Sequence, residues 1–310
     1  MSASRVALRG TTLAMASAAA LVALTTPVLA HVKWFAPFVV GAAPAPTTDT
    51  LANPWNWLAT GLVLVFFAVT VVIERSRFGD IVLSGLDRLS APLWARNDDF
   101  MRAIVGAFFV AIFAVGGIYL TPDLRTPFEL VSWIQLLIAA CVFSRRTMPL
   151  AAGGIVVLWI IALRDYDFFH LLDYLALGLG VAAYLFLASF PNAKYHGRRF
   201  EVLRWGVAIA LMWSSLEKFA YPEWFWPLVE ERPFLTFGMP RDVFIPMAGV
   251  AEFTMGFGLL WTPLVRRLSA LALLLIFFSA VYPFGRVDLV GHALIMGTLP
   301  FALTGGIWFL

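Results

Sequence analysis

Nine apolar runs, most of them long enough to cross a lipid bilayer, follow one another along the chain. A transmembrane helix needs about 20 predominantly apolar residues, and a soluble domain rarely contains more than one such run. The composition agrees, since 61% of the 310 residues are hydrophobic and 13% are charged. The sequence therefore predicts an all-α polytopic membrane protein with about nine transmembrane helices. The runs cover residues 55–74, 101–120, 128–143, 148–163, 169–189, 201–220, 243–262, 267–284 and 288–308.

The first 30 residues have the layout of a secretory signal peptide. Arg5 and Arg9 form a positively charged start, residues 13–24 form a short apolar run, and small residues precede a cleavage position after Ala30. Cleavage at this position would make His31 the first residue of the mature protein. An uncleaved first span is the alternative.

Basic residues gather at one end of the predicted spans, which sets the expected orientation. The connections on that side carry Arg75, Arg77, Arg88, Arg96, Arg145, Arg146, Lys194, Arg198, Arg199, Arg266 and Arg267. The opposite connections carry single arginines among acidic residues. By the positive-inside rule the mature N-terminus lies outside, and residues 78–100 form a cytoplasmic amphipathic helix at the membrane interface. Because the arginines are not gathered on one face, nucleic acid is not an expected partner.

The last eight runs have the layout of two tandem four-helix units, residues 101–190 and residues 200–310. Each unit opens with an arginine at its inner edge, Arg102 or Arg204, and has a pair of arginines after its second run. Residues 31–100 precede them as an extracytoplasmic lead-in, a first span and the amphipathic segment. We therefore expect a duplicated helical unit behind a single N-terminal span.

Glu252 is the only ionisable side chain in the run 243–261 and falls near its middle. A carboxylate at that depth costs several kcal/mol unless it is protonated or partnered, so such a residue is often functional. Glu217 and Lys218 lie at the outer end of the preceding span. If the three side chains face one another, they form an outward-opening polar pocket suited to a proton-transfer step. The alternative is a structural ion pair and a snorkelling lysine.

The second unit resembles the DoxX family of small four-span membrane proteins. The resemblance rests on Lys218 at the end of one span, Gly238 before the next, and Glu252 followed by Gly256 within it. It covers about 100 residues, and the first unit departs from it, with Gln135 as the nearest polar counterpart of Glu252. The resemblance implies a subunit of a quinone- or thiol-linked oxidoreductase system in the bacterial inner membrane. It also implies a periplasmic or membrane redox partner.

Histidines form a second group of candidates on the outer side. His170 precedes Asp173 by three residues and His292 follows Asp288 by four, so each imidazole shares a helical face with a carboxylate. A carboxylate beside a histidine is a common second-shell arrangement at metal sites, and equally common for an ordinary hydrogen-bonded histidine.

An N-terminal His31 would offer its α-amino group and its ring nitrogen together. Nitrogen-rich planar sites favour Cu(II), and His170 or His292 would supply a third donor, so the set is similar to a histidine-brace copper site. A haem held by His170 and His292 is the weaker alternative. Three functions therefore stay open: a redox subunit using quinone, copper binding at the outer face, and a scaffold or assembly factor without chemistry.

Overall fold

The computed structural model describes residues 42–303, and this part of the chain is helical without any β-strand. Residues 1–41 and 304–310, which include the predicted signal peptide and His31, lie outside the described residues. The prediction of an all-α fold is confirmed for the part described. The helices are α3 (Thr47–Ala52), α4 (Pro54–Glu74), α5 (Arg77–Trp94), α6 (Asn97–Val115), α7 (Leu130–Cys141), α8 (Met148–Ala162), α9 (Phe168–Ser189), α10 (Ala193–Ala220), η1 (Pro222–Phe225), α11 (Trp226–Glu231), η2 (Pro233–Thr236), α12 (Arg241–Gly258) and α13 (Pro263–Ala302).

The helix boundaries follow the apolar runs, with two instructive differences. α6 ends at Val115 rather than at residue 120, because Gly116 and Gly117 have positive φ angles of 71° and 62° that terminate the helix. The runs 267–284 and 288–308 lie on α13, which is interrupted at Gly285 with φ 76° and ψ −156°. α13 is therefore two helical arms joined at a glycine.

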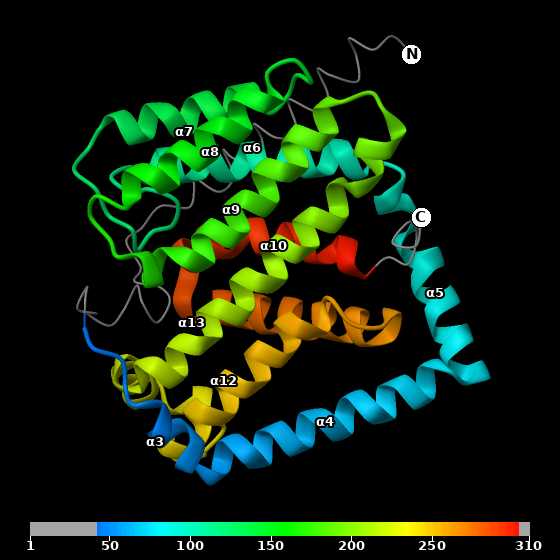
Figure 1. Cartoon of the computed structure of the whole chain (residues 1–310), viewed down its shortest axis with the longest axis vertical. Helices are drawn as coiled ribbons and strands as arrows, with labels where there is room; N and C mark the ends of the chain where they lie inside the picture. The colour runs from blue at the N-terminus through cyan, green and yellow to red at the C-terminus, as the bar shows by residue number, and fades with distance from the viewer. Residues whose placement is uncertain (1–41, 304–310) are drawn as a thin grey trace.

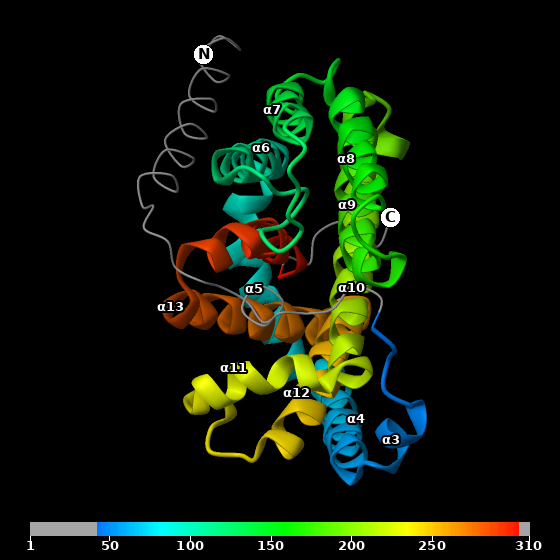
Figure 2. The same ribbon diagram turned by 90° about the vertical axis from the view of Figure 1, so that its left-hand side faces the viewer.

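The helices alternate in direction between the two sides of Figure 1. α4 crosses from left to right, α6 returns to the left, and the arms of α13 make the last two crossings, while α9 and α10 run diagonally. The connections predicted to be cytoplasmic lie on the right, and those predicted to be extracytoplasmic lie on the left. Figure 2 shows α8, α9 and α10 in one layer, with α6 and α13 in contact beside it.

α5 departs from this pattern, because it climbs the right side of Figure 1 from the end of α4 to the start of α6. Ser76 caps its first turn by accepting a hydrogen bond from the backbone N–H of Gly79 at 3.3 Å. Arg267 of α13 holds α5 in place, donating to the carbonyl of Leu83 at 3.0 Å and to the Asp87 carboxylate. α5 is thus fixed across the ends of other helices.

α9 and α10 meet backbone to backbone at a pair of glycines. A Cβ atom on Gly206 would lie 2.6 Å from Cα of Gly180 and 2.7 Å from the carbonyl oxygen of Ala176. Only glycine allows so close an approach, which is common between helices in membranes. Because α9 belongs to the first predicted unit and α10 to the second, this contact joins the two, and their buried residues form one continuous core.

Large apolar side chains also remain on the surface, most densely along α4. Leu64 and Val72 are 63% and 70% exposed, and similar residues line α7, α8 and the first arm of α13. By length and apolar composition, α4 and α9 are the described helices that qualify as membrane spans, whereas α7, α8 and the second arm of α13 are apolar but shorter.

Candidate functional site around Lys218 and Glu252

Lys218 and Glu252 form an ion pair between α10 and α12. Nζ of Lys218, in the last turn of α10, lies 2.5 Å from Oε2 of Glu252. The lysine side chain is 14% exposed and the glutamate side chain 37% exposed. The ring of Phe225 lies beneath the ammonium group, with its centroid 4.8 Å from Nζ. The ammonium group is therefore held by a carboxylate and an aromatic face, and Glu252 keeps access to the surface.

Two glycines on α12 bring the paired helices together. A Cβ atom on Gly249 would lie 2.7 Å from the Phe219 ring and 3.2 Å from Cβ of Lys218. One on Gly256 would lie 3.1 Å from the backbone nitrogen of Met212. Residues seven apart share a helical face, so both glycines open the face of α12 that contacts α10. The short distance between Lys218 and Glu252 follows from this close packing.

Glu217 is only 2% exposed and faces a different neighbour. Successive residues of a helix point about 100° apart, so Glu217 and Lys218 leave α10 in different directions. Burial, Asp167 and Glu217 raise the pKa of the Tyr221 hydroxyl, just beyond the end of α10. The expected group of three is therefore a Lys218–Glu252 pair, with Glu217 buried on a different face of α10.

His170 lies in the first turn of α9, where Asp167 bonds both its backbone N–H and its imidazole ring. The Asp167 carboxylate caps the helix by accepting from the backbone N–H of His170 at 3.0 Å, and it also bonds Nδ1 of the ring. Asp173, the carboxylate expected from the sequence, is buried and accepts from the backbone N–H of Tyr174 at 2.8 Å. The capping aspartate was missed, although an Asp three residues before a histidine at a helix start is a readable N-cap signal.

An outer-loop cluster, made of Tyr221, Trp224, Phe225, Val229 and Ile245, connects His170 with Lys218. Tyr221 and Trp224 stack with their ring centroids 4.0 Å apart, and the His170 ring stacks on Trp224 at 5.1 Å. Phe225, the next residue, lies beneath Lys218. His170 and the Lys218–Glu252 pair therefore both pack against aromatic rings of this cluster.

Trp224, Phe225 and Trp226 follow one another in the loop between α10 and α12, a pattern that favours an aromatic belt at a membrane surface. The structure differs from this expectation, because Trp224 and Phe225 are 8% and 6% exposed and only Trp226 of the three is exposed. The reason is local, because η1 turns the chain back over the ends of α9 and α10 and buries the two rings against His170 and Lys218.

His292 and Asp288 form a separate buried pair on the second arm of α13. Nδ1 of His292 lies 3.3 Å from Oδ1 of Asp288, and the imidazole stacks on Phe277 with centroids 4.6 Å apart. The shared helical face expected from their spacing is thus present. Asp288 is fully buried, in the first turn after Gly285, where the helix dipole favours a negative charge.

No group of three His, Cys, Asp or Glu side chains within residues 42–303 is arranged to hold a metal ion. His31, the centre of the copper hypothesis, lies outside the described residues, so that hypothesis stays a prediction. The first described residues pack against the outer-loop cluster, since the Tyr221 hydroxyl donates to the carbonyl of Ala42 at 3.2 Å and the N–H of Ala45 donates to the carbonyl of Ala220 at 2.7 Å.

Gln135, the expected counterpart of Glu252 in the first unit, is fully buried on α7. Its amide donates to the carbonyls of Ile118 and Tyr119 at 2.7 and 2.8 Å. In both units a polar residue on the second long helix therefore reaches back toward the first, to the loop just after α6 in one unit and to the last turn of α10 in the other. In the first unit the bond is neutral, and in the second it is an ion pair.

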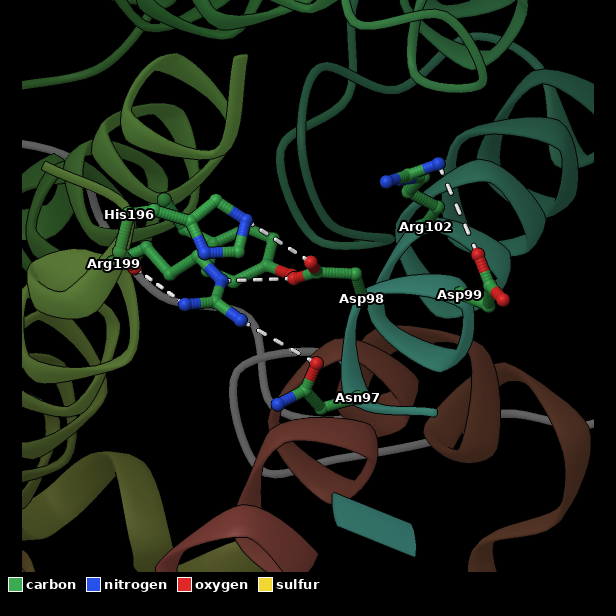
Figure 3. Close-up of polar contacts among 7 residues, drawn as sticks. Asn97, Asp98, Asp99, Arg102, His196 and Arg199 are labelled. Atoms are coloured by element: carbon green, nitrogen blue, oxygen red, sulfur yellow. Dashed lines mark hydrogen bonds and ion pairs between the residues drawn. The ribbon is translucent and has the colours of Figure 1, made fainter. Parts of the chain in front are cut away.

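Sequence reasoning missed a polar network on the opposite side of the molecule, shown in Figure 3. Asp98, at the start of α6, accepts hydrogen bonds from Arg199 Nε and from the Tyr184 hydroxyl, both at 2.8 Å. His196 Nε2 lies 3.2 Å from the other Asp98 oxygen, and Arg199 also reaches Asn97. These residues join α6 to α9 and α10. No local pattern predicts such contacts between distant residues.

Asp98 and His196 of this network precede the predicted spans 101–120 and 201–220, and both have lowered pKa values. Burial lowers the pKa of His196, and the adjacent Arg199 charge lowers it further, against the opposing effect of Asp98. Burial alone would raise the pKa of Asp98, but Arg199, Tyr184 and His196 outweigh it and hold the pKa below 3.8. The network therefore favours an ionised Asp98 beside a neutral His196.

No protein-family model, curated protein or solved structure matches this chain. The similarity to the DoxX family accordingly stays a prediction from the residues that carry it.

Proposed function

We propose that the chain is an integral membrane protein with nine spans, formed by α4, α6–α10, α12 and the two arms of α13. Two observations support this topology. The exposed surface of α4 is almost entirely apolar, which is unfavourable in water and favourable in lipid. The clustered arginines of the connections gather at one end of the helices, as the positive-inside rule requires for a cytoplasmic side.

We further propose that this membrane protein is a subunit of a quinone- or thiol-linked redox system. The Lys218–Glu252 pair carries the assignment, because it sets a partly exposed carboxylate beside a fixed ammonium group, close to the predicted outer surface. Such a carboxylate can give a proton to, or take one from, a quinone reduced or oxidised by a partner protein. The similarity to DoxX proteins supports the same assignment.

The proposal is tested by titrating the purified protein with a short-chain quinone and its quinol while following tryptophan fluorescence. Trp224 adjoins the site, so a bound ring is expected to quench its emission. E252Q and K218M should each weaken binding by about tenfold, the magnitude of one lost charge-assisted hydrogen bond. E201Q, at an exposed position of the same α10, is the matched control. Equal binding by all four proteins would contradict the assignment, and reduced abundance without lost binding would favour the scaffold.

Copper binding at the outer face is the second candidate, favoured by the position of Ala42. That residue contacts Tyr221, whose ring centroid lies 5.7 Å from that of His170. His31 precedes Ala42 by eleven positions, and an extended chain of that length reaches about 36 Å, so the distance allows a shared site. Stoichiometric copper in the processed protein, lost on acetylating the N-terminus and in H170Q, is the expected result. An unprocessed N-terminus or a metal-free sample would exclude it.

A further inference from the structure

α9 presents an exposed apolar stripe that runs along its second half. Leu179 and Phe186 are 46% and 48% exposed, and Phe190, which follows the last residue of the helix, is 36% exposed. Positions seven and then four residues apart share a helical face. α9 also qualifies as a membrane span by its length and apolar composition. In the proposed topology this stripe therefore faces lipid.

The stripe continues across the connection to α10 through contacts between aromatic rings. The ring centroid of Phe190 lies 5.0 Å from that of Phe186 and 5.6 Å from that of Tyr195, in the first turn of α10. The Tyr195 side chain is 48% exposed. Tyrosine gathers where acyl chains meet headgroups, because its ring is apolar and its hydroxyl group is polar. The three rings therefore lead from the acyl region of a leaflet toward its headgroups.

α10 is longer than its predicted span, which places its first two turns at headgroup depth. Its 28 residues extend about 42 Å at 1.5 Å per residue, close to the thickness of a bilayer with its headgroups. Because the predicted span begins at residue 201, Lys194 and Arg198 lie about 10 and 5 Å before it along the helix axis. The connection between α9 and α10 lies on the right in Figure 1, with the others predicted to be cytoplasmic.

Two positive charges share the exposed side of this segment with Tyr195. At about 100° per residue, Lys194, Tyr195 and Arg198 fall within a sector of about 100°, and all three are exposed. The network of Asp98, shown in Figure 3, occupies the other side of the helix. The first acidic residue of α10, Glu201, is at the start of the predicted span. At headgroup depth, α10 therefore offers an ammonium and a guanidinium group beside an aromatic ring.

We propose that this corner of α9 and α10 binds an anionic phospholipid of the inner leaflet. Lys194 and Arg198 hold the headgroup phosphate, and the rings of Phe186, Phe190 and Tyr195 pack along the acyl chains. A zwitterionic lipid carries a compensating ammonium group, so two adjacent cations favour an anionic one. The inference rests on the proposed membrane topology and adds to it a lipid class and a binding site.

The test counts lipids that stay bound to the full-length protein after release from nanodiscs made of equal amounts of phosphatidylglycerol and phosphatidylcholine. Native mass spectrometry should show phosphatidylglycerol retained in preference. K194Q/R198Q should reduce that preference by about fivefold for each charge removed.

R75Q/R77Q is the matched control, because it removes two exposed charges from another inner connection. That corner is fixed by a hydrogen bond from the backbone N–H of Leu264 to the Glu74 carboxylate at 2.8 Å. The control should keep the full preference, and both double variants should unfold at the temperature of the parent protein.

A second measurement tests the topology separately. With Cys141→Ala removing the single cysteine, a fluorescent probe at L179C on the stripe of α9 should be quenched by brominated acyl chains. No quenching would reject the membrane topology itself. Quenching together with equal retention of the two lipids, or with equal loss of preference in R75Q/R77Q, would leave the spans in place and overturn the lipid site. Displacement of the retained lipid by inorganic phosphate would assign the two cations to a free anion and overturn it as well.

Discussion

The Lys218–Glu252 pair should stabilise the fold by more than a surface ion pair does. Two unit charges 4 Å apart attract by about 4 kcal/mol at an effective dielectric constant near 20, and desolvation offsets much of that. Because the Glu252 side chain keeps 37% of its exposure, we expect a coupling energy of about 1.5–2 kcal/mol. A double-mutant cycle of K218M, E252Q and the double variant measures it by reversible unfolding in bicelles.

The chain provides an internal control in the ion pair of Arg241 with Glu230, whose side chains are 45% and 58% exposed. The cycle of R241M and E230Q should give a coupling below about 0.5 kcal/mol. A Lys218–Glu252 coupling no larger than this would refute the argument from burial. The charge swap K218E/E252K separates structure from chemistry, since it should regain stability without regaining quinone binding.

Three further predictions concern packing and titration. G206A should destabilise the protein by about 2 kcal/mol, because its methyl group would enter the contact with α9, whereas G197A, with open space around it, should be neutral or stabilising in thermal unfolding. Q135L should cost about 2–3 kcal/mol in the same assay, because it leaves two buried carbonyl groups without their donor. The lowered pKa values of Asp98 and His196 mean that the unfolded chain binds more protons, so stability should fall as pH drops below about 6.5 and again below about 3.8. H196Q should remove the first decline and D98N the second, and an unchanged pH profile in both variants would contradict this account.

Much of the helical layout could be predicted from the sequence, because apolar periodicity is a local property. The end of α6 could not be placed from apolarity alone, since residues 118–120 are apolar and the two glycines before them end the helix. The Lys218–Glu252 contact was anticipated because polar groups are scarce in these runs, and scarce polar groups tend to pair. Asp98 and Arg199 stand 101 residues apart, and their pairing depends on how α6 and α10 pack.

The hydrogen bond from Leu264 to Glu74 spans 190 positions of the chain and has a consequence for biogenesis. At ribosomal rates of about 5–20 residues per second, roughly 10–40 s pass between synthesis of the acceptor and of its donor. During that interval α4 lacks α12 and α13, its main packing partners. Until α12 and α13 have been synthesised, the apolar surface of α4 that they cover must therefore be protected by something else, such as lipid or a chaperone.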